Sequence, residues 1–135
     1  MTRILPLLFL GLAFLSSAQA GDGLFVAPGH RSAILASVNE EFLRVQPCGI
    51  ATGPSRYLVD HLAIEDEWAC IAGSARYEGH TGPFAVKFIA LLKWDCGCWQ
   101  VSSISFDAAN VSRRKLVGMR QVPSAILPRW IRWSP

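Results

Sequence analysis

The chain has 135 residues, with 13 lysines and arginines against 10 aspartates and glutamates. This length suits one domain and leaves no room for a second of typical size. The formal net charge of +3 is too small to indicate a nucleic-acid partner or an anionic membrane surface.

Residues 1–20 have the pattern of a secretory signal peptide. Arg3 gives a positive start, an apolar run follows, and Ala18-Gln19-Ala20 is the small-x-small sequence that a signal peptidase cuts. The apolar run is too short to span a bilayer, and no second long apolar stretch follows. We therefore expect an exported protein, periplasmic or secreted, with no stable membrane anchor and with a single domain over residues 21–135.

The mature chain is expected to open with an extended lead-in that ends at the breaker Pro28-Gly29. A helix is predicted over Arg31–Val45, and Pro47 and Gly49 end it. Apolar side chains recur on this segment at helical spacing and form one stripe: Ile34, Leu35, Val38 and Phe42.

The rest of the domain is predicted to be mainly strands. Four segments rich in β-branched and aromatic residues are each bounded by turn formers: Tyr57–Ile64, Trp68–Tyr77, Phe84–Trp94 and Cys98–Phe106. The second and third segments are joined by a longer connection over residues 78–83. This order predicts an α+β fold in which the N-terminal helix packs on a curved, mainly antiparallel four-stranded sheet.

The turn of the last hairpin predicts how its two strands pair. If Cys96 and Gly97 form a two-residue turn, Asp95 lies opposite Cys98. The face expected to meet the helix then carries Phe88, Leu92, Trp94, Trp99 and Val101. The opposite face, expected to be wetter, carries Lys87, Lys93, Gln100 and Ser102.

An aromatic tail closes the chain. Asp107 is predicted to cap a short helix through Leu116, and the tail begins at Pro123. Tryptophan and arginine are enriched at interface hot spots, and the tail alternates them. The candidate partner-binding residues are therefore Arg129, Trp130, Arg132 and Trp133, with packing over the sheet edge as the alternative.

The order of these elements resembles nuclear-transport-factor-two-like and cystatin-like α+β domains, and more particularly a group of small exported bacterial proteins. The resemblance covers residues 31–106 and rests on hydrophobic positions and one turn glycine: Arg31, Ile34, Leu35, Trp68, Ala69, Leu91, Leu92, Gly97, Trp99 and Val101. It implies the fold and brings no catalytic residues with it. The paired cysteines depart from the charged hairpin tip usual in that group.

Four cysteines follow the predicted signal peptide: Cys48, Cys70, Cys96 and Cys98. An even count in an oxidising compartment favours a disulfide. We expect Cys70 and the hairpin cysteines to lie at one end of the sheet, which favours a bridge from Cys70 to Cys96 or Cys98 over one from Cys48 to Cys70. A redox bridge between Cys96 and Cys98 is an alternative, and the spacing does not suit a closed metal site.

Asp60-His61 is the one acid–base pair of interest. Adjacent residues of a regular strand point to opposite faces, so the pair is not expected to share a site. Asp60 would share its face with Leu58, Leu62 and Ile64. Since sheets of the class that the chain resembles often hold a pocket, Asp60 is a candidate ligand-binding residue.

No complete nucleophile, metal or phosphate-binding pattern appears in the sequence, and no cofactor is implied. The leading hypothesis is therefore an exported, non-catalytic domain that binds a protein partner or a small ligand, such as an inhibitor or immunity-type protein. The alternatives are a small pocket enzyme with Asp60 as acid or base, and a thiol-redox accessory protein that uses Cys96 and Cys98.

Overall fold

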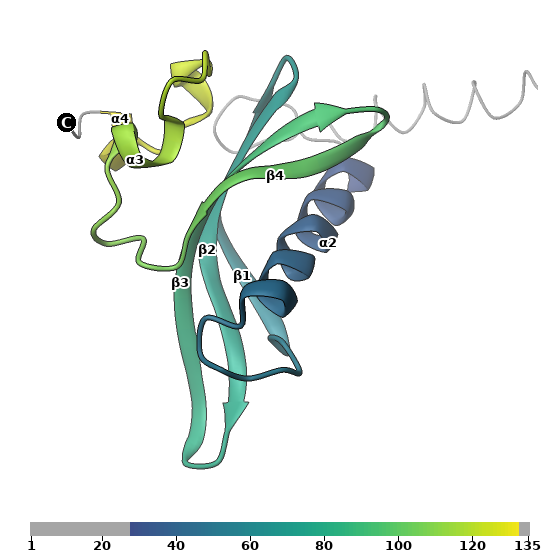
Figure 1. Cartoon of the computed structure of the whole chain (residues 1–135), viewed down its shortest axis with the longest axis vertical. Helices are drawn as coiled ribbons and strands as arrows, with labels where there is room; N and C mark the ends of the chain where they lie inside the picture. The colour runs from purple at the N-terminus through teal and green to yellow at the C-terminus, as the bar shows by residue number, and fades with distance from the viewer. Residues whose placement is uncertain (1–27, 133–135) are drawn as a thin grey trace, which may run out of the picture.

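The structure, a computed structural model, describes residues 28–132, so the predicted signal peptide and Trp133 lie outside the described residues. The described residues form one long helix and four strands, followed by three short helices (Figure 1). The elements are α2 (Pro28–Val45), β1 (Arg56–Glu65), β2 (Trp68–Gly79), β3 (Gly82–Asp95), β4 (Cys98–Ser105), α3 (Arg113–Val117), the 3₁₀ helix η1 (Ser124–Ile126) and α4 (Arg129–Arg132). This confirms the predicted α+β fold, with the helix packed on a four-stranded antiparallel sheet.

The long helix begins three residues earlier than predicted. Pro28 is its first residue and Gly29 its second, so this pair opens α2 and does not separate it from the lead-in. Proline suits the first turn of a helix, because its fixed φ is helical and the N–H group that it lacks would have no partner there.

The strands run in the order β1-β2-β3-β4, and every neighbouring pair is antiparallel. The predicted register of the last hairpin is confirmed, because Asp95 pairs with Cys98 and Trp94 with Trp99. Cys96 and Gly97 both have positive φ, 52° and 82°, as a primed two-residue turn requires. The loop predicted over residues 78–83 is instead a tight turn, with Gly79 paired to Gly82.

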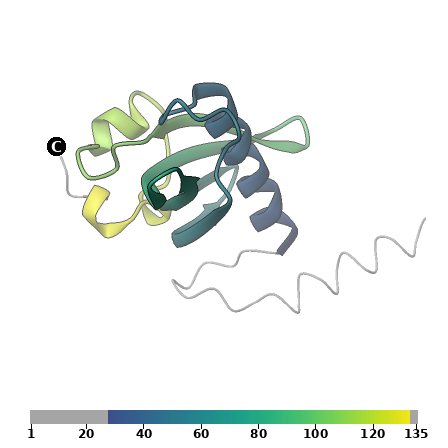
Figure 2. The ribbon, with the colours of Figure 1, turned by 90° about the horizontal axis from the view of Figure 1, so that it is seen from below.

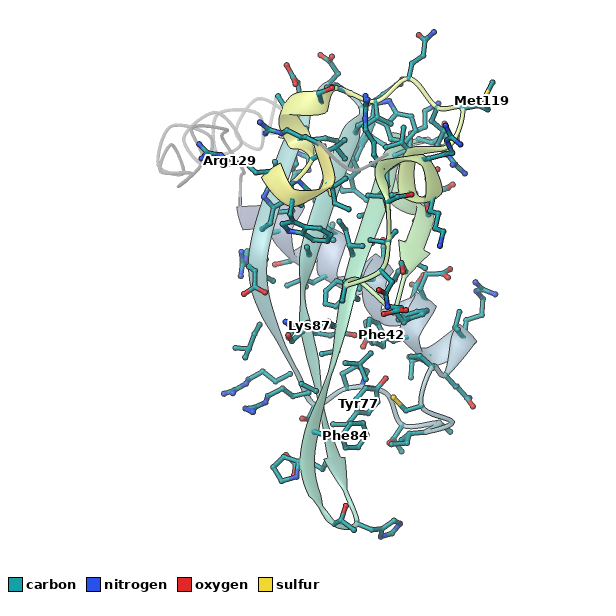
Figure 3. All side chains as sticks on the ribbon, turned by 90° about the vertical axis from the view of Figure 1, so that its left-hand side faces the viewer. Phe42, Tyr77, Phe84, Lys87, Met119 and Arg129 are labelled. Carbon is teal, nitrogen blue, oxygen red and sulfur yellow. The ribbon has the colours of Figure 1, made fainter. Side chains whose placement is uncertain are left out.

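The face of the sheet that meets α2 holds the predicted core. Phe42 lies at its centre (Figure 3). The centroid of its ring is 5.4 Å from that of Phe88 and 4.9 Å from that of Phe106. The buried members of this helix-face core are Ile34, Val38, Phe42, Ala69, Ile71, Ala75, Tyr77, Phe88, Ala90, Leu92 and Trp99. Every residue of the predicted helix stripe contributes to it, with Leu35 partly buried.

The first turn of α2 is joined to the β3–β4 hairpin by an aromatic cluster. The Trp99 indole N–H donates to His30 Nδ1 at 3.0 Å, and the His30 ring makes edge contacts with both Trp94 and Trp99. Farther along the helix, the Ser37 hydroxyl donates to the Trp99 carbonyl at 2.7 Å. His30, which the sequence shows only as a histidine near a helix start, therefore holds the helix on the hairpin.

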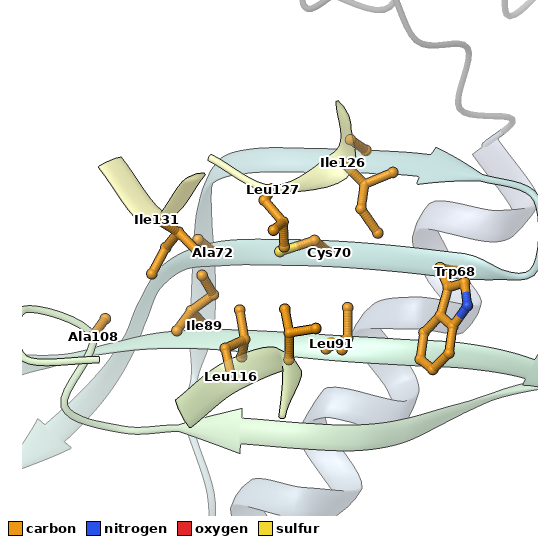
Figure 4. Close-up of a cluster of buried hydrophobic side chains, with 12 residues drawn as sticks. Trp68, Cys70, Ala72, Ile89, Leu91, Ala108, Leu116, Ile126, Leu127 and Ile131 are labelled. Carbon is orange, nitrogen blue, oxygen red and sulfur yellow. The ribbon is translucent and has the colours of Figure 1, made fainter. Parts of the chain in front are cut away.

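The opposite face of the sheet carries a second core in place of the wet surface that we expected. Residues 107–132, here called the C-terminal segment, fold over it, so that the sheet lies between α2 and this segment (Figure 2). Its buried residues come from three strands and the C-terminal segment (Figure 4): Ala63, Trp68, Cys70, Ala72, Ile89, Leu91, Ala108, Leu116, Val117, Ile126, Leu127 and Ile131. Lys93, one of the polar residues that suggest a wet face, has its Nζ 5.5 Å from the centroid of the Trp68 ring.

The short helix of the C-terminal segment begins later than predicted. Ser112, and not Asp107, caps α3, because its hydroxyl accepts from the backbone N–H of Lys115 at 3.2 Å. The Asp107 carboxylate instead accepts from the Asn110 side chain. Among residues 28–132, none of the helices is both long enough and apolar enough to cross a membrane.

Candidate functional site

A β-bulge in β1 brings Asp60 and His61 to the same face of the sheet. Val59 pairs with Gly73 and His61 with Ala72, so Asp60 is an extra residue with no partner across the ladder. Such an insertion reverses the alternation of side chains beyond it. Leu62 and Ile64 therefore join the helix-face core, whereas Asp60 and His61 both face the C-terminal segment.

This geometry corrects two expectations. Asp60 and His61 do share a site, and Asp60 does not share its face with Leu62 and Ile64. The rule of alternating faces failed because it holds only for a regular strand.

Gly73 on β2 makes room for the bulge. A Cβ atom at this position would overlap the carbonyl oxygen of Leu58 and would lie 3.1 Å from Val59 Cα. Both obstacles are backbone atoms, so no change of rotamer could relieve the clash. A glycine within a buried strand is the sequence signal of such a close approach, and Gly73 stands here opposite Val59, the residue just before two consecutive polar residues.

The bulge forms one wall of a cleft between the sheet and the C-terminal segment. The cleft has a volume of about 840 Å³, within the usual range for small-molecule sites. Strands β1 to β3 supply Asp60, His61, Ala72, Gly73, Lys87 and Phe88, and the C-terminal segment supplies Ala108, Ala109, Ala125, Leu127, Pro128, Arg129, Trp130 and Arg132. Apolar and charged groups thus meet in one concave site.

Hydrogen bonds hold the two walls of the cleft in place. His61 Nε2 lies 2.6 Å from the Ile126 carbonyl, which can only accept, so Nε2 carries a proton and donates. Arg132 donates from Nε to the Leu127 carbonyl and from Nη2 to the Ala125 carbonyl, each at 2.8 Å. His61 therefore ties the C-terminal segment to β1, and Arg132 braces the turn between η1 and α4.

The aromatic tail both packs and faces solvent. Ile126, Leu127 and Ile131 are fully buried in the second core. Trp130 remains 51% exposed and Arg129 is exposed, and both line the cleft with Arg132. Three of the four candidate partner-binding residues therefore meet at one site, and the fourth, Trp133, lies outside the described residues.

The four cysteines are all unbonded and lie apart from the cleft. Cys70 is buried in the second core and pairs with Leu91, whereas Cys98 pairs with Asp95 at the hairpin tip. The two positions are separated by four residues of β3, roughly 13 Å at the rise of a strand, and a disulfide requires Cα atoms closer than about 7 Å. The expected bridge from Cys70 to Cys96 or Cys98 is therefore incompatible with the register.

Two of the thiols, Cys70 and Cys96, are disfavoured as thiolates. Burial raises the pKa of Cys70 to about 12, and the charge of the neighbouring Asp95 carboxylate raises the pKa of the exposed Cys96. A raised pKa disfavours the thiolate, which is the nucleophile and the metal ligand. Within residues 28–132, no three histidine, cysteine, aspartate or glutamate side chains are grouped so that they could hold a metal ion.

The fold and the site together define an α+β domain with a ligand-sized cleft between an antiparallel sheet and a C-terminal helical segment. Comparisons of the chain with protein-family models, with curated proteins and with solved structures found no match. Conclusions about function therefore depend on the cleft itself.

Proposed function

We propose that this protein is an exported, non-catalytic domain that binds a small ligand in the cleft between its sheet and its C-terminal segment. The observation that carries the proposal is the convergence of Asp60, His61 and Lys87 on a concave site of about 840 Å³. A few polar groups set among apolar walls are typical of ligand sites, where the polar groups orient the ligand and the apolar walls bind it. Such a domain needs no catalytic set.

Export is supported by the pattern of residues 1–20 and belongs to the same proposal. Together with the resemblance to small exported α+β proteins, it suggests a binding protein of the periplasm or the extracellular space. Intact-mass measurement of the exported protein should find Gly21 as the first residue. Recovery of the full-length chain from the cytoplasm alone would contradict export.

Filling the cleft should abolish ligand binding without unfolding the domain. Ala109 is exposed and lines the cleft, so Ala109→Phe places a ring in the space that a ligand would occupy. Ala36 is equally exposed on α2, on the other side of the sheet, so Ala36→Phe is the matched control. A ligand at a hundred times its Kd stabilises a protein by about 2.7 kcal/mol, which raises the Tm of a domain of this size by about 10 °C.

We expect compounds from a small-molecule library to raise the Tm of the wild type and of Ala36→Phe, and not that of Ala109→Phe. Titration calorimetry on the compounds that raise the Tm should show binding to the wild type and to Ala36→Phe, and none to Ala109→Phe. Hits that bind Ala109→Phe as tightly as the wild type would place the ligand elsewhere. If the protein bound only another protein, through Arg129 and Trp130, no small molecule would shift the Tm, and the proposal would fail.

A second candidate function is a pocket enzyme with Asp60 as acid or base. The bulge favours it, because it sets a histidine beside the carboxylate in one cleft. In a screen for hydrolytic turnover, Asp60→Asn should then lower kcat by about 10²–10⁴-fold while the Tm is retained. Asp66→Asn, in the exposed turn after β1, is the control. Absence of turnover, or turnover that is insensitive to Asp60→Asn, would rule out this second function and leave ligand binding as the only one proposed.

A further inference from the structure

The cleft is dominated by positive charge. Lys87 of β3 lines it on the side of the sheet, and Arg129 and Arg132 of α4 line it on the side of the C-terminal segment, so the cations come from both walls. Asp60 is the one carboxylate among the residues that line the cleft. No ion pair of Lys87, Arg129 or Asp60 is found within residues 28–132, so these charges are not neutralised by one another.

The guanidinium group of Arg132 is held in place by hydrogen bonds within the protein. Two of its three guanidinium nitrogens donate to the carbonyls of Leu127 and Ala125, which fixes the plane of the group. The third nitrogen, Nη1, makes no hydrogen bond within the described part of the chain. A donor that is already ordered loses little conformational entropy when an anion binds it.

Trp130 adds an aromatic surface beside these cations. About half of its surface is exposed, and it lines the cleft together with Leu127 and Pro128. An exposed indole can stack on a planar group without the cost of a new cavity. The cleft therefore combines a cationic site with a flat apolar one.

We propose that the ligand is a small organic anion with a planar body. Its charged head, a carboxylate or a phosphate, is held by the ordered guanidinium of Arg132, while Lys87 and Arg129 add attractive positive charge to the same cleft, and its body lies on Trp130. This inference rests on the proposed function, because it names the class of ligand that the same cleft takes.

The test compares probes that differ in one feature at a time. Phenylacetate and phenyl phosphate carry both the ring and an anionic head, and they distinguish carboxylate from phosphate. Phenylacetamide is the neutral counterpart, 2-phenylethylamine the cationic one, and acetate and inorganic phosphate lack the ring. By calorimetry at low salt we expect one of the ringed anions to bind at least about tenfold more tightly than every probe that lacks the ring or the charge. Added NaCl should weaken that binding.

Single substitutions then assign the two halves of the ligand. Lys87→Gln and Arg129→Gln should each weaken binding of the ringed anion by about 3- to 10-fold, since each removes one attractive charge. Trp130→Ala should weaken it by a similar factor and reduce the preference for the ringed probe. The controls lie outside the cleft on exposed surface: Lys115→Gln, Arg114→Gln and Met119→Ala.

The outcomes separate this inference from the proposed function. Binding of the neutral or cationic probe that Ala109→Phe abolishes, with no preference for anions, would overturn the anionic ligand and leave the cleft as the binding site. Binding of the anion that Lys115→Gln weakens as much as Lys87→Gln would show nonspecific attraction and overturn the inference. If no probe and no library compound bound in the cleft, both would fail.

Discussion

Trp99→Ala is expected to lower the free energy of unfolding by about 3–5 kcal/mol, a large part of the stability of a domain of this size. Trp99 is only 4% exposed, and it packs in the helix-face core. Truncation leaves a cavity between α2 and the β3–β4 hairpin. It also removes the N–H group that His30 Nδ1 accepts from at 3.0 Å, so the histidine loses its partner.

Chemical denaturation measures this loss, and Trp94→Ala is the matched control. Trp94 stands opposite Trp99 in the same hairpin, yet it is 38% exposed. Its truncation should lower the free energy of unfolding by about 1–2 kcal/mol, because Trp94 buries less apolar area on folding than Trp99 does and its removal breaks no hydrogen bond. Equal effects of the two substitutions would mean that Trp99 does not anchor the helix.

Gly73→Ala should destabilise the domain by about 3 kcal/mol and should also weaken ligand binding. The added Cβ meets the Leu58 carbonyl oxygen and Val59 Cα, so β1 must move away from β2 at the bulge. That movement displaces Asp60 and His61 from the wall of the cleft. Thermal unfolding measures the first effect, and calorimetry with whichever probe binds the wild type measures the second.

Gly29→Ala is the control for this prediction. A Cβ at Gly29, in the first turn of α2, meets nothing within 4 Å. The same substitution should therefore be neutral or stabilise by about 0.5 kcal/mol, since alanine loses less backbone entropy in a helix. If Gly73→Ala were as well tolerated as Gly29→Ala, the bulge would not depend on close approach of the two strands.

The candidate site was only partly predictable. The sequence makes Asp60 a candidate by its position in a strand and makes the tail a candidate by its tryptophans and arginines. The same reasoning places Lys87 on the expected wet face and sets His61 apart from Asp60. The signals that could have corrected this were Gly73 in a buried strand and two adjacent polar residues in β1, which together are typical of a bulge.

The features that can be predicted from the sequence are those that depend on neighbours along the chain. The stripe of α2, the four strands and the turn at Cys96-Gly97 are local, because periodicity and turn chemistry act over a few residues. The face on which Asp60 lies depends instead on how two strands fit together, and the burial of the second face depends on where the C-terminal segment packs. Both depend on contacts between residues far apart in the sequence, and local patterns carry no information about such contacts, so the cleft becomes visible only in the folded domain.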